Sequence, residues 1–254
     1  MLGSPGEVKE ILNICKSFKI KLIEDTAWGL GAKYQNKYLG TLGDIGTFSF
    51  DYAKTITTGE GGMVIFKNKK TFDKAKAWHD HGHENNPKLP RWRDTRKSEG
   101  FNFRISEITA AIGIAQIEKL KMILEYQRVN ANYLINKLKK LNMKCFNFRL
   151  IPANTIANYD AVILIFKDKK QSVFLKKKLE QNNLSTKILP EAITWHFSYY
   201  WKHIKKLKNN NLIISLDILS RSLAIPINCK MKKNILDKYV YIIANSIKNE
   251  KIFS

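Results

Sequence analysis

Three side chains in the first half of the sequence could carry chemistry: the carboxylate of Asp25, the hydroxyl of Ser49 and the amine of Lys54. Asp25 follows a short apolar run, where a carboxylate is costly to bury unless a cationic group pairs with it. Ser49 and Lys54 lie in and just after a predicted strand, so a hydroxyl and an amine could converge on one ligand. The glycine-rich segment 57–62 would let the backbone approach that ligand closely.

An acid, a lysine and a hydroxyl are the groups that proteins use to hold pyridoxal phosphate. The lysine forms a Schiff base, the acid keeps the pyridinium nitrogen protonated, and hydroxyls with backbone amides bind the phosphate. The same residue types have ordinary explanations, because an aspartate at a strand end commonly forms a turn and a single lysine commonly lies on the surface. Spacing alone therefore leaves both interpretations open.

A longer series of motifs surrounds these residues. It consists of an acidic pair, Gly-Ala, Gly-Asp-x-Gly, Phe-Ser-Phe, a lysine and Thr-Thr-Gly-Glu-Gly-Gly, at positions 24–25, 31–32, 43–46, 48–50, 54 and 57–62. It continues with His81-Gly82, the segment 100–104 and Glu107. In this order the motifs resemble the sugar aminotransferases of the DegT/DnrJ/EryC1/StrS family, which are pyridoxal phosphate enzymes of fold type I. The resemblance covers residues 1–130 well, and the remainder agrees mostly in pattern.

The resemblance implies a role for each candidate residue. Lys54 would form the Schiff base and move the proton of the amino transfer, which favours aminotransferases over the related dehydratases that carry histidine there. Asp25 would pair with the pyridinium nitrogen and Ser49 would bind the cofactor phosphate. Asn102 would reach the phosphate of a neighbouring subunit, which implies a homodimer with shared active sites. Alternatively, Asn102 forms only a polar turn before the next helix.

Trp28 departs from the family pattern, in which glutamine or histidine commonly stands beside the cofactor ring. An indole cannot accept a hydrogen bond, so Trp28 would stack on the ring or wall it. The alternative is a tryptophan that belongs to the core.

The segment 79–96 is predicted to be a long loop, and long loops in compact domains are commonly functional or disordered. Its three histidines have no helix to align them, and transamination needs no metal, so we expect no metal site. Arg91, Arg93 and Arg96 could bind a carboxylate or phosphate, or be solvated loop residues. His196 lies in a Trp-His-Phe segment that could line the substrate pocket or form a packed aromatic cluster.

The loop 79–96 together with Trp28 resembles one branch of the family, the 8-amino-3,8-dideoxy-manno-octulosonate transaminases. Their acceptor is a free sugar acid, so the resemblance implies a carboxylate clamp. More generally, it implies glutamate as amino donor and a keto or aldehyde sugar as acceptor, for lipopolysaccharide or other cell-surface polysaccharide synthesis.

The elements that must position these residues follow from hydrophobic periodicity. The fold class that pattern and resemblance indicate is α/β, a fold type I aminotransferase with a partial large α/β/α domain and connecting helix over residues 1–141, followed by a small α+β domain over residues 142–254. Helices are predicted at 6–18, 71–78, 105–141 (one bent helix or two), 170–181 and 232–248, and strands at 21–23, 47–50, 62–66, 159–166, 184–188 and 223–227.

Composition limits the other classes of function. The chain has 254 residues and a net charge of +22, but 37 of its 44 basic residues are lysine, whereas base and phosphate recognition rely more on arginine. No apolar run is long enough to span a bilayer. Three scattered cysteines offer no zinc spacing or disulfide framework, which favours a reducing cytoplasm.

Complete members of the family carry a long amino-terminal part before the equivalent of Gly3. It supplies the first strands of the sheet, a phosphate-binding loop and the aromatic residue that stacks on the cofactor, so we expect exposed sheet edges and apolar faces here. Two other classes of function stay open. One is a truncated, non-catalytic chain that binds a partner, and the other is a basic polyanion-binding protein, for which no nucleic-acid-binding signature is found.

Overall fold

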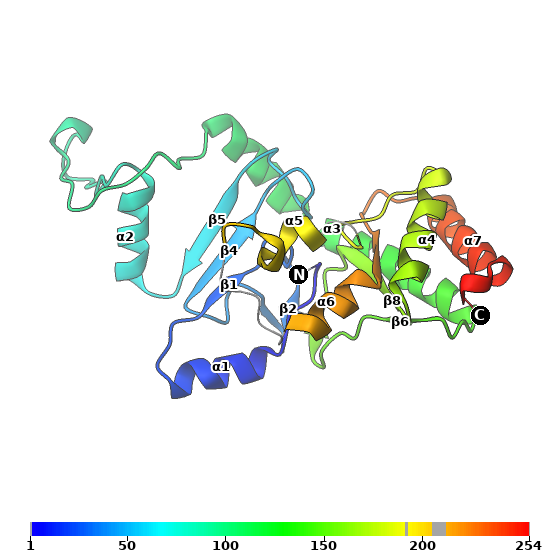
Figure 1. Ribbon diagram of the computed structural model, residues 1–254. Coiled ribbons are helices and arrows are strands. Elements are labelled where there is room, and N and C mark those ends of the chain that lie inside the picture. The colour runs from blue at the N-terminus through cyan, green and yellow to red at the C-terminus, as the bar shows by residue number, and fades with distance from the viewer. Residues whose placement is uncertain (1, 191–192, 205–211, 254) are drawn as a thin grey trace. The chain divides into compact units, whose positions relative to one another are not determined.

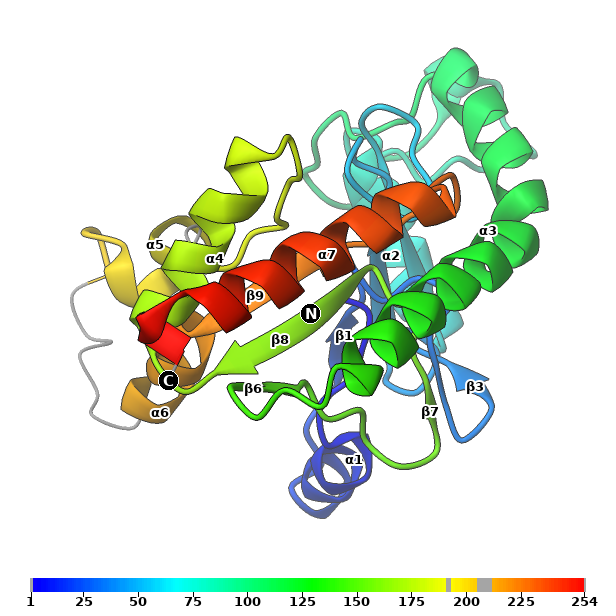
Figure 2. The same cartoon turned by 90° about the vertical axis from the view of Figure 1, so that its right-hand side faces the viewer.

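The computed structural model describes residues 2–190, 193–204 and 212–253. The chain divides into two compact units, one comprising residues 1–122 with 152–158 and the other comprising residues 123–151 with 159–254. A single helix of 34 residues, α3 (Glu107–Lys140), runs from one unit into the other, which settles the choice between one helix and two (Figure 2). The domain boundary predicted after residue 141 stays a prediction.

A three-stranded sheet organises the first unit (Figure 1). β1 (Ile23–Asp25) pairs in parallel with β4 (Ile45–Ser49), and β4 pairs antiparallel with β5 (Gly62–Phe66). The helix α1 (Val8–Ser17) precedes β1, and α2 (Lys69–His79) follows β5. All five elements occur where periodicity predicts them, with bounds shifted by up to two residues.

The turn before β4 is held by Glu24. Its carboxylate accepts backbone hydrogen bonds from Gly40 at 2.8 Å and from Leu42 and Gly43 at 2.6 Å each. Neighbouring residues of a strand face opposite sides of a sheet. Glu24 is therefore committed to the turn, while Asp25 projects from the other face of β1.

Gly46 in β4 is required by the close approach of the same turn. A Cβ at position 46 would lie 2.0 Å from the carbonyl oxygen of Gly40, a distance that no side chain tolerates. Gly40 itself has a φ of +89°, in the region that glycine adopts without strain.

A second, small sheet brings a distant segment back to the first unit. β2 (Lys33–Tyr34) pairs antiparallel with β3 (Lys37–Tyr38) on one side and with β7 (Thr155–Ile156) on the other. Sequence analysis missed these strands, because two residues are too few to show a hydrophobic period. Their pairing matters for the site, because it places the segment 152–158 in this unit.

The second unit is an antiparallel sheet with helices packed on it (Figure 2). Its strand order is β6 (Phe146–Phe148), β8 (Ala161–Phe166) and β9 (Ser222–Pro226). The helix α4 (Lys169–Gln181) packs against β8, β9 and α7 (Lys233–Asn249). Their interior side chains form one core with the second half of α3, including Leu134, Leu138, Leu164, Phe166, Leu175, Leu179, Leu223, Leu236 and Ile243.

Two shorter α-helices, α5 (Ile193–His196) and α6 (Ile213–Ser220), also belong to this unit. The strand predicted at 184–188 is wrong. Lys187 donates one backbone bond to Ala224 of β9 at 2.8 Å, but Ile188 then turns away with a φ of +65°. The apolar residues of this segment reflect burial and not strand pairing.

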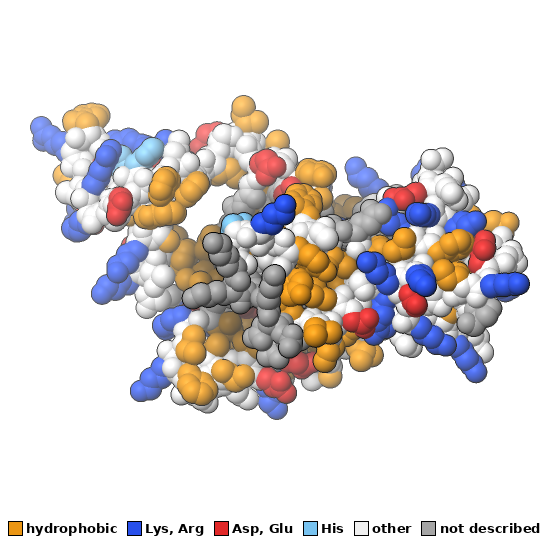
Figure 3. All heavy atoms as spheres, in the orientation of Figure 1, with side chains coloured by type: hydrophobic (Ala, Val, Ile, Leu, Met, Phe, Trp, Pro, Cys, Tyr) orange, Lys and Arg blue, Asp and Glu red, His pale blue; other side chains and the backbone are white. Residues whose placement is uncertain are grey.

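Apolar side chains of the first unit remain uncovered. Met63 and Val64 are neighbours on β5 and so face opposite sides of the sheet, yet they are 44% and 48% exposed. The helix α1 has no buried residue, and Ile14 on it is 55% exposed. Hydrophobic side chains are accordingly visible among the basic side chains in Figure 3. Neither face of the sheet is closed at β5, as the sequence led us to expect.

We predict that Gly46→Ala destabilises the first unit severely, while Gly6→Ala does not. The added methyl group at residue 46 meets the Gly40 carbonyl, whereas a Cβ at residue 6 meets no atom within 4 Å. The expected loss for Gly46→Ala is about 3 kcal/mol or more of unfolding free energy, against a change within about 0.5 kcal/mol for the control. Urea unfolding of both variants is the measurement, and equal midpoints would show that the turn is not packed on β4.

Candidate active site

Two of the candidate residues end neighbouring parallel strands. Asp25 is the last residue of β1 and Ser49 the last residue of β4, so both lie at the carboxyl edge of this pair. Asp25 is the register partner of Thr47, which lies two residues before Ser49. Side chains in this relation share one face of a sheet. Open α/β sheets bind ligands at the carboxyl ends of their parallel strands, and the structure places both residues there.

The surroundings of Asp25 differ from those expected. Its side chain is exposed, and its Oδ1 accepts a hydrogen bond from the backbone of Ala27 at 3.1 Å. Water hydrates an exposed carboxylate, so Asp25 does not require a cationic partner here. Ser49 is half-buried, and its Oγ accepts a bond from the backbone of Asp51 at 3.3 Å.

Lys54 lies on the loop between β4 and β5. Backbone bonds close this loop at its base, from Phe50 to Gly61 at 2.8 Å and from Thr58 to Phe50 at 2.9 Å. The Nζ of Lys54 lies 4.2 Å from the centroid of the Trp28 ring, where the ring attracts a cation electrostatically. Trp28 is half-buried and faces the amine, so it is placed to wall the site of that amine.

Sequence analysis missed one residue of this site, Asn158. It is fully buried, and its Nδ2 donates to the carbonyl oxygens of Trp28 and Leu30 at 3.1 Å each and lies 3.4 Å from Oγ1 of Thr55. Asn158 follows Thr55 by 103 residues and belongs to no motif. No local pattern could have identified it, because its role comes from the pairing of β7 with β2.

The segment 79–104, which we call the arm, leaves the end of α2 and returns to the start of α3 (Figure 1). Its backbone is bridged between Asp80 and Asn102 and between His83 and Arg96. It contains one turn of 3₁₀ helix, Arg91–Arg93, and no strand of more than one residue. The predicted long loop is therefore confirmed, with internal hydrogen bonds that give it a defined course.

A buried carboxylate organises the arm. Asp80 accepts hydrogen bonds from Arg104 at 2.9 Å and from Arg91 at 3.4 Å. Burial alone would raise the pKa of Asp80, but a hydrogen bond from Asn85 and the two guanidinium charges outweigh it and hold the pKa below its usual value. The arm is thus fastened by a charged group that is buried and paired.

The three arginines proposed as an anion site have different surroundings. Arg91 pairs with Asp80, Arg96 donates to Nε2 of His83 at 3.0 Å, and Arg93 is exposed. The structure therefore places two of the guanidinium groups on partners within the arm and does not gather all three on one point. Their role towards a substrate stays a prediction.

Asn102 is exposed, and its Oδ1 accepts hydrogen bonds from Nε of Arg104 at 3.2 Å and from the backbone of Arg104 at 3.4 Å. These contacts fit the alternative of a polar turn before α3. Its reach to a neighbouring subunit stays a prediction.

His196 lies in the second unit, at the end of α5. It is exposed, with its ring centroid 4.8 Å from that of Trp195, while Nε1 of Trp201 donates to the Trp195 carbonyl at 2.9 Å. The rings of Trp195 and His196 are neighbours, but both side chains are exposed, Trp195 by 75%, so they do not form the packed aromatic cluster that was the alternative. A role of His196 with substrate stays a prediction. Within residues 2–190, 193–204 and 212–253, no group of three or more His, Cys, Asp or Glu side chains could hold a metal ion. The same ranges contain no helix long and apolar enough to cross a bilayer.

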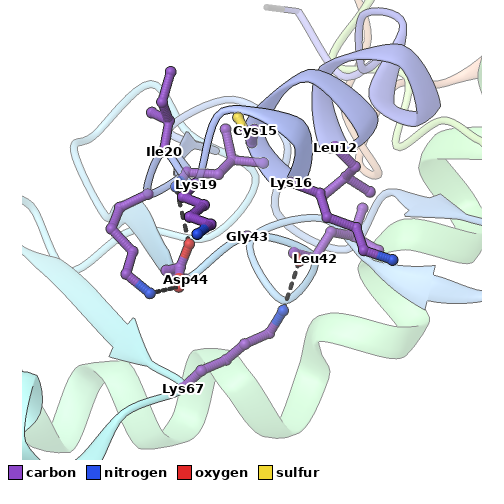
Figure 4. A pocket seen from close by; sticks show the side chains of 11 residues that line it. Leu12, Cys15, Lys16, Lys19, Ile20, Leu42, Gly43, Asp44 and Lys67 are labelled. Carbon is purple, nitrogen blue, oxygen red and sulfur yellow. Dashed lines mark hydrogen bonds and ion pairs between the residues drawn. The ribbon is translucent and has the colours of Figure 1, made fainter.

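A cavity of about 310 Å³ lies at the opposite edge of the sheet (Figure 4). Its walls include Leu22 just before β1, Asp44 just before β4, and Lys67 just after β5. Lys21 pairs with Asp44 at 2.9 Å, and Lys67 donates to the Leu42 carbonyl at 2.6 Å. The amino ends of β1 and β4 form this edge, so the cavity is separate from the candidate active site.

Comparison with known proteins identifies first the class of fold, the α/β fold type I of aminotransferases, and then the family. PseC of Helicobacter pylori, an aminotransferase involved in the biosynthesis of pseudoaminic acid, superimposes with a TM-score of 0.84 at 20% identity, over 98% of this chain and 65% of that one. The sequence model of the DegT/DnrJ/EryC1/StrS aminotransferase family matches residues 1–244 of this chain. The chain belongs to this family of pyridoxal phosphate-dependent aminotransferases.

Two curated relatives show how much of the family's length the chain spans. GDP-perosamine synthase of Escherichia coli O157:H7 is 41% identical over 128 residues, which are 50% of this chain and 34% of the relative. A UDP-4-amino-4,6-dideoxy-N-acetyl-beta-L-altrosamine transaminase of Campylobacter jejuni is 29% identical over 92% of this chain and 60% of its own length. The chain therefore spans less than two thirds of these relatives.

The residues present fit the cofactor that the family indicates, pyridoxal phosphate. An amine, a carboxylate and a hydroxyl are the required groups, and Lys54, Asp25 and Ser49 would provide them. Asp25 and Ser49 share one sheet edge and face, and Lys54 follows Ser49 by five residues. None of the relatives named above belongs to the octulosonate branch, and membership of that branch stays a prediction.

We predict that acid loosens the arm. Asp80, Glu84 and Asp94 all have a pKa held below the usual value. For Glu84, hydrogen bonds from Thr95 and Lys97 cause the shift, and for Asp94 backbone hydrogen bonds outweigh the effect of burial. A lowered native pKa stabilises the folded form above the unfolded value, near 4, and this stabilisation is lost as the pH falls through the native pKa.

Hydrogen exchange of arm peptides, corrected for intrinsic rates, should therefore rise as the pH falls below about 4. Arg104→Leu should produce the same rise already at pH 7, because it leaves the buried Asp80 without its nearer guanidinium group. Arg93→Leu, at an exposed position, is the matched control and should not raise the exchange rate at pH 7. Equal exchange in the two variants at pH 7 would contradict the structure of the arm.

Proposed function

We propose that this chain carries the lysine-bearing part of a pyridoxal phosphate-dependent sugar aminotransferase. The reaction would transfer the amino group of glutamate to a keto or aldehyde sugar, for lipopolysaccharide or other cell-surface polysaccharide synthesis in the cytoplasm. The observation that carries the proposal is the Lys54 amine held over the Trp28 ring, on the loop that follows the strand-end Ser49. Family membership supports it, as do relatives whose names denote sugar transaminases.

Each residue of the site has a task that its chemistry allows. When bound, pyridoxal phosphate supplies an electron sink for the substrate carbon that loses its proton. The Lys54 amine would hold the cofactor and then carry a proton between substrate and cofactor positions. Asp25 would place a negative charge at the ring nitrogen, and Ser49 would donate its hydroxyl to the phosphate. Trp28 would wall the site and keep water from the amine.

Other residues would act on the acceptor and on a second copy of the chain. We propose that four side chains bind the sugar, those of Arg91, Arg93, Arg96 and His196. We also propose that Asn102 reaches the cofactor phosphate of a neighbouring subunit in a homodimer. All three arginines are exposed, and Arg93 is the best placed of them because Arg91 and Arg96 already have partners in the arm. A free sugar acid such as a 3-deoxy-octulosonate would suit a guanidinium group. The large and small domains would be residues 1–141 and 142–254.

A second candidate function is partner binding without catalysis. It is favoured by the apolar residues of β5 that are exposed on both faces of the sheet. In that case the chain would retain no cofactor, although Lys54 is present.

The experiment that tests the proposed function uses the full chain and pyridoxal phosphate. We expect a visible absorption band that survives desalting, and borohydride should then fix the cofactor on the peptide that contains Lys54. Lys54→Ala should lose the band. Lys33→Ala is the matched control, because its amine also lies over an aromatic ring, 4.4 Å from the centroid of Tyr38, and it should keep the band. Equal loss in both variants, or a wild-type chain that retains no cofactor, would overturn the proposal.

A further inference from the structure

We propose that Asn158 is a positioning residue for Lys54. Its side-chain amide would tie the loop that carries the amine to the segment that carries the Trp28 ring. The inference rests on the proposed function, because it names what holds the proposed cofactor-binding amine in place.

The geometry joins one donor group to two segments. Nδ2 of Asn158 donates to the carbonyl oxygens of Trp28 and Leu30 at 3.1 Å each, and it lies 3.4 Å from Oγ1 of Thr55. Thr55 is the residue after Lys54, and the Trp28 carbonyl belongs to the residue whose ring lies under the amine. The amide group of Asn158 therefore connects the loop that carries Lys54 to the segment that carries Trp28.

The carbonyls that Asn158 satisfies lie outside regular secondary structure. The segment after β1 turns through backbone bonds from Gly29 to Thr26 at 2.8 Å and from Ala32 to Gly29 at 3.0 Å. These turns use the carbonyls of Thr26 and Gly29, while those of Trp28 and Leu30 receive the amide of Asn158. Buried carbonyl groups require a donor, and here a side chain provides it.

The type of residue at position 158 follows from the three oxygen atoms it faces. An asparagine amide has two N–H donors, whereas an aspartate of the same shape has none at neutral pH and would set its charge against those oxygens. The backbone of Asn158 is fixed as well, since its N–H donates to the Gly3 carbonyl at 3.1 Å. Asn158 is 0% exposed, so water does not replace a lost donor without rearrangement.

The second unit offers a matched control, Asn130. It is also buried, and its Nδ2 also donates to two backbone carbonyls, those of Asn228 at 2.9 Å and Met231 at 3.2 Å. Removing this amide costs the same kind of hydrogen bonds in a unit that does not contain Lys54.

The experiment compares the wild-type chain with Asn158→Ala, Asn158→Asp and Asn130→Ala. Each full-length protein is treated with pyridoxal phosphate and borohydride over a range of pH, and labelling of Lys54 relative to Lys33 is measured by peptide mass. We expect both Asn158 variants to reduce the relative labelling of Lys54 by about tenfold and to change its pH profile. Asn130→Ala should lower the urea midpoint but leave the relative labelling of Lys54 unchanged.

The outcomes separate this inference from the proposed function. If wild-type Lys54 is not labelled in preference to Lys33, the proposed function fails. If the preference exists and persists in Asn158→Ala, the proposed function stands and the inference is wrong. Should Asn158→Ala not fold, Thr55→Val decides, since it removes only the hydroxyl next to Lys54; an unchanged preference and pH profile in that variant would overturn the inference.

Discussion

The carboxylate of Glu24 accepts three backbone N–H groups from a turn that lies against Gly46, and this contact connects β1 to the start of β4. With it, Ile23 pairs with Ile45 and Asp25 with Thr47. A slip of one residue would turn every side chain of β1 to the other face, so Glu24 would face the candidate site and Asp25 the turn. The placement of the strand-end residues therefore depends on hydrogen bonds made by Glu24, the acidic residue next to Asp25.

In the arm, as at Glu24, charged side chains hold the backbone in place. Arginine is scarce in this lysine-rich chain, yet Arg91, Arg93, Arg96 and Arg104 all lie in the arm. Two of them donate to the buried Asp80, a task that suits a planar guanidinium group better than an ammonium group because it is less strongly hydrated and directs several donors. Clustered arginines thus fasten this segment to its own carboxylate, which accounts for part of the pattern that sequence analysis assigned to an anion site.

Long amphipathic helices and the strand at 62–66 could be predicted from the sequence, because burial of one face imposes a period that survives in the residue pattern. The family could be predicted because its motifs are local and ordered. The structure of the segment 184–188 could not be predicted, because buried apolar residues give the same sequence pattern whether or not they pair in a sheet. Asn158 could not either, because the three oxygen atoms that it faces belong to residues 103 to 130 positions earlier, and two-residue strands bring it to them. The exposure of Asp25 depends on which elements cover the sheet, which the pattern of β1 alone does not record.

The distance along the chain between Thr55 and Asn158 also sets an order of events during synthesis. A ribosome adds about 5 to 20 residues per second, so the 103 residues between them take roughly 5 to 20 seconds to make. During that interval the nascent chain already carries the complete glycine-rich loop and its lysine, while the amide that joins this loop to the tryptophan segment does not yet exist. The hydrogen bonds of Asn158 to these two segments can thus form only after the polypeptide has passed through the long helix and into the second unit.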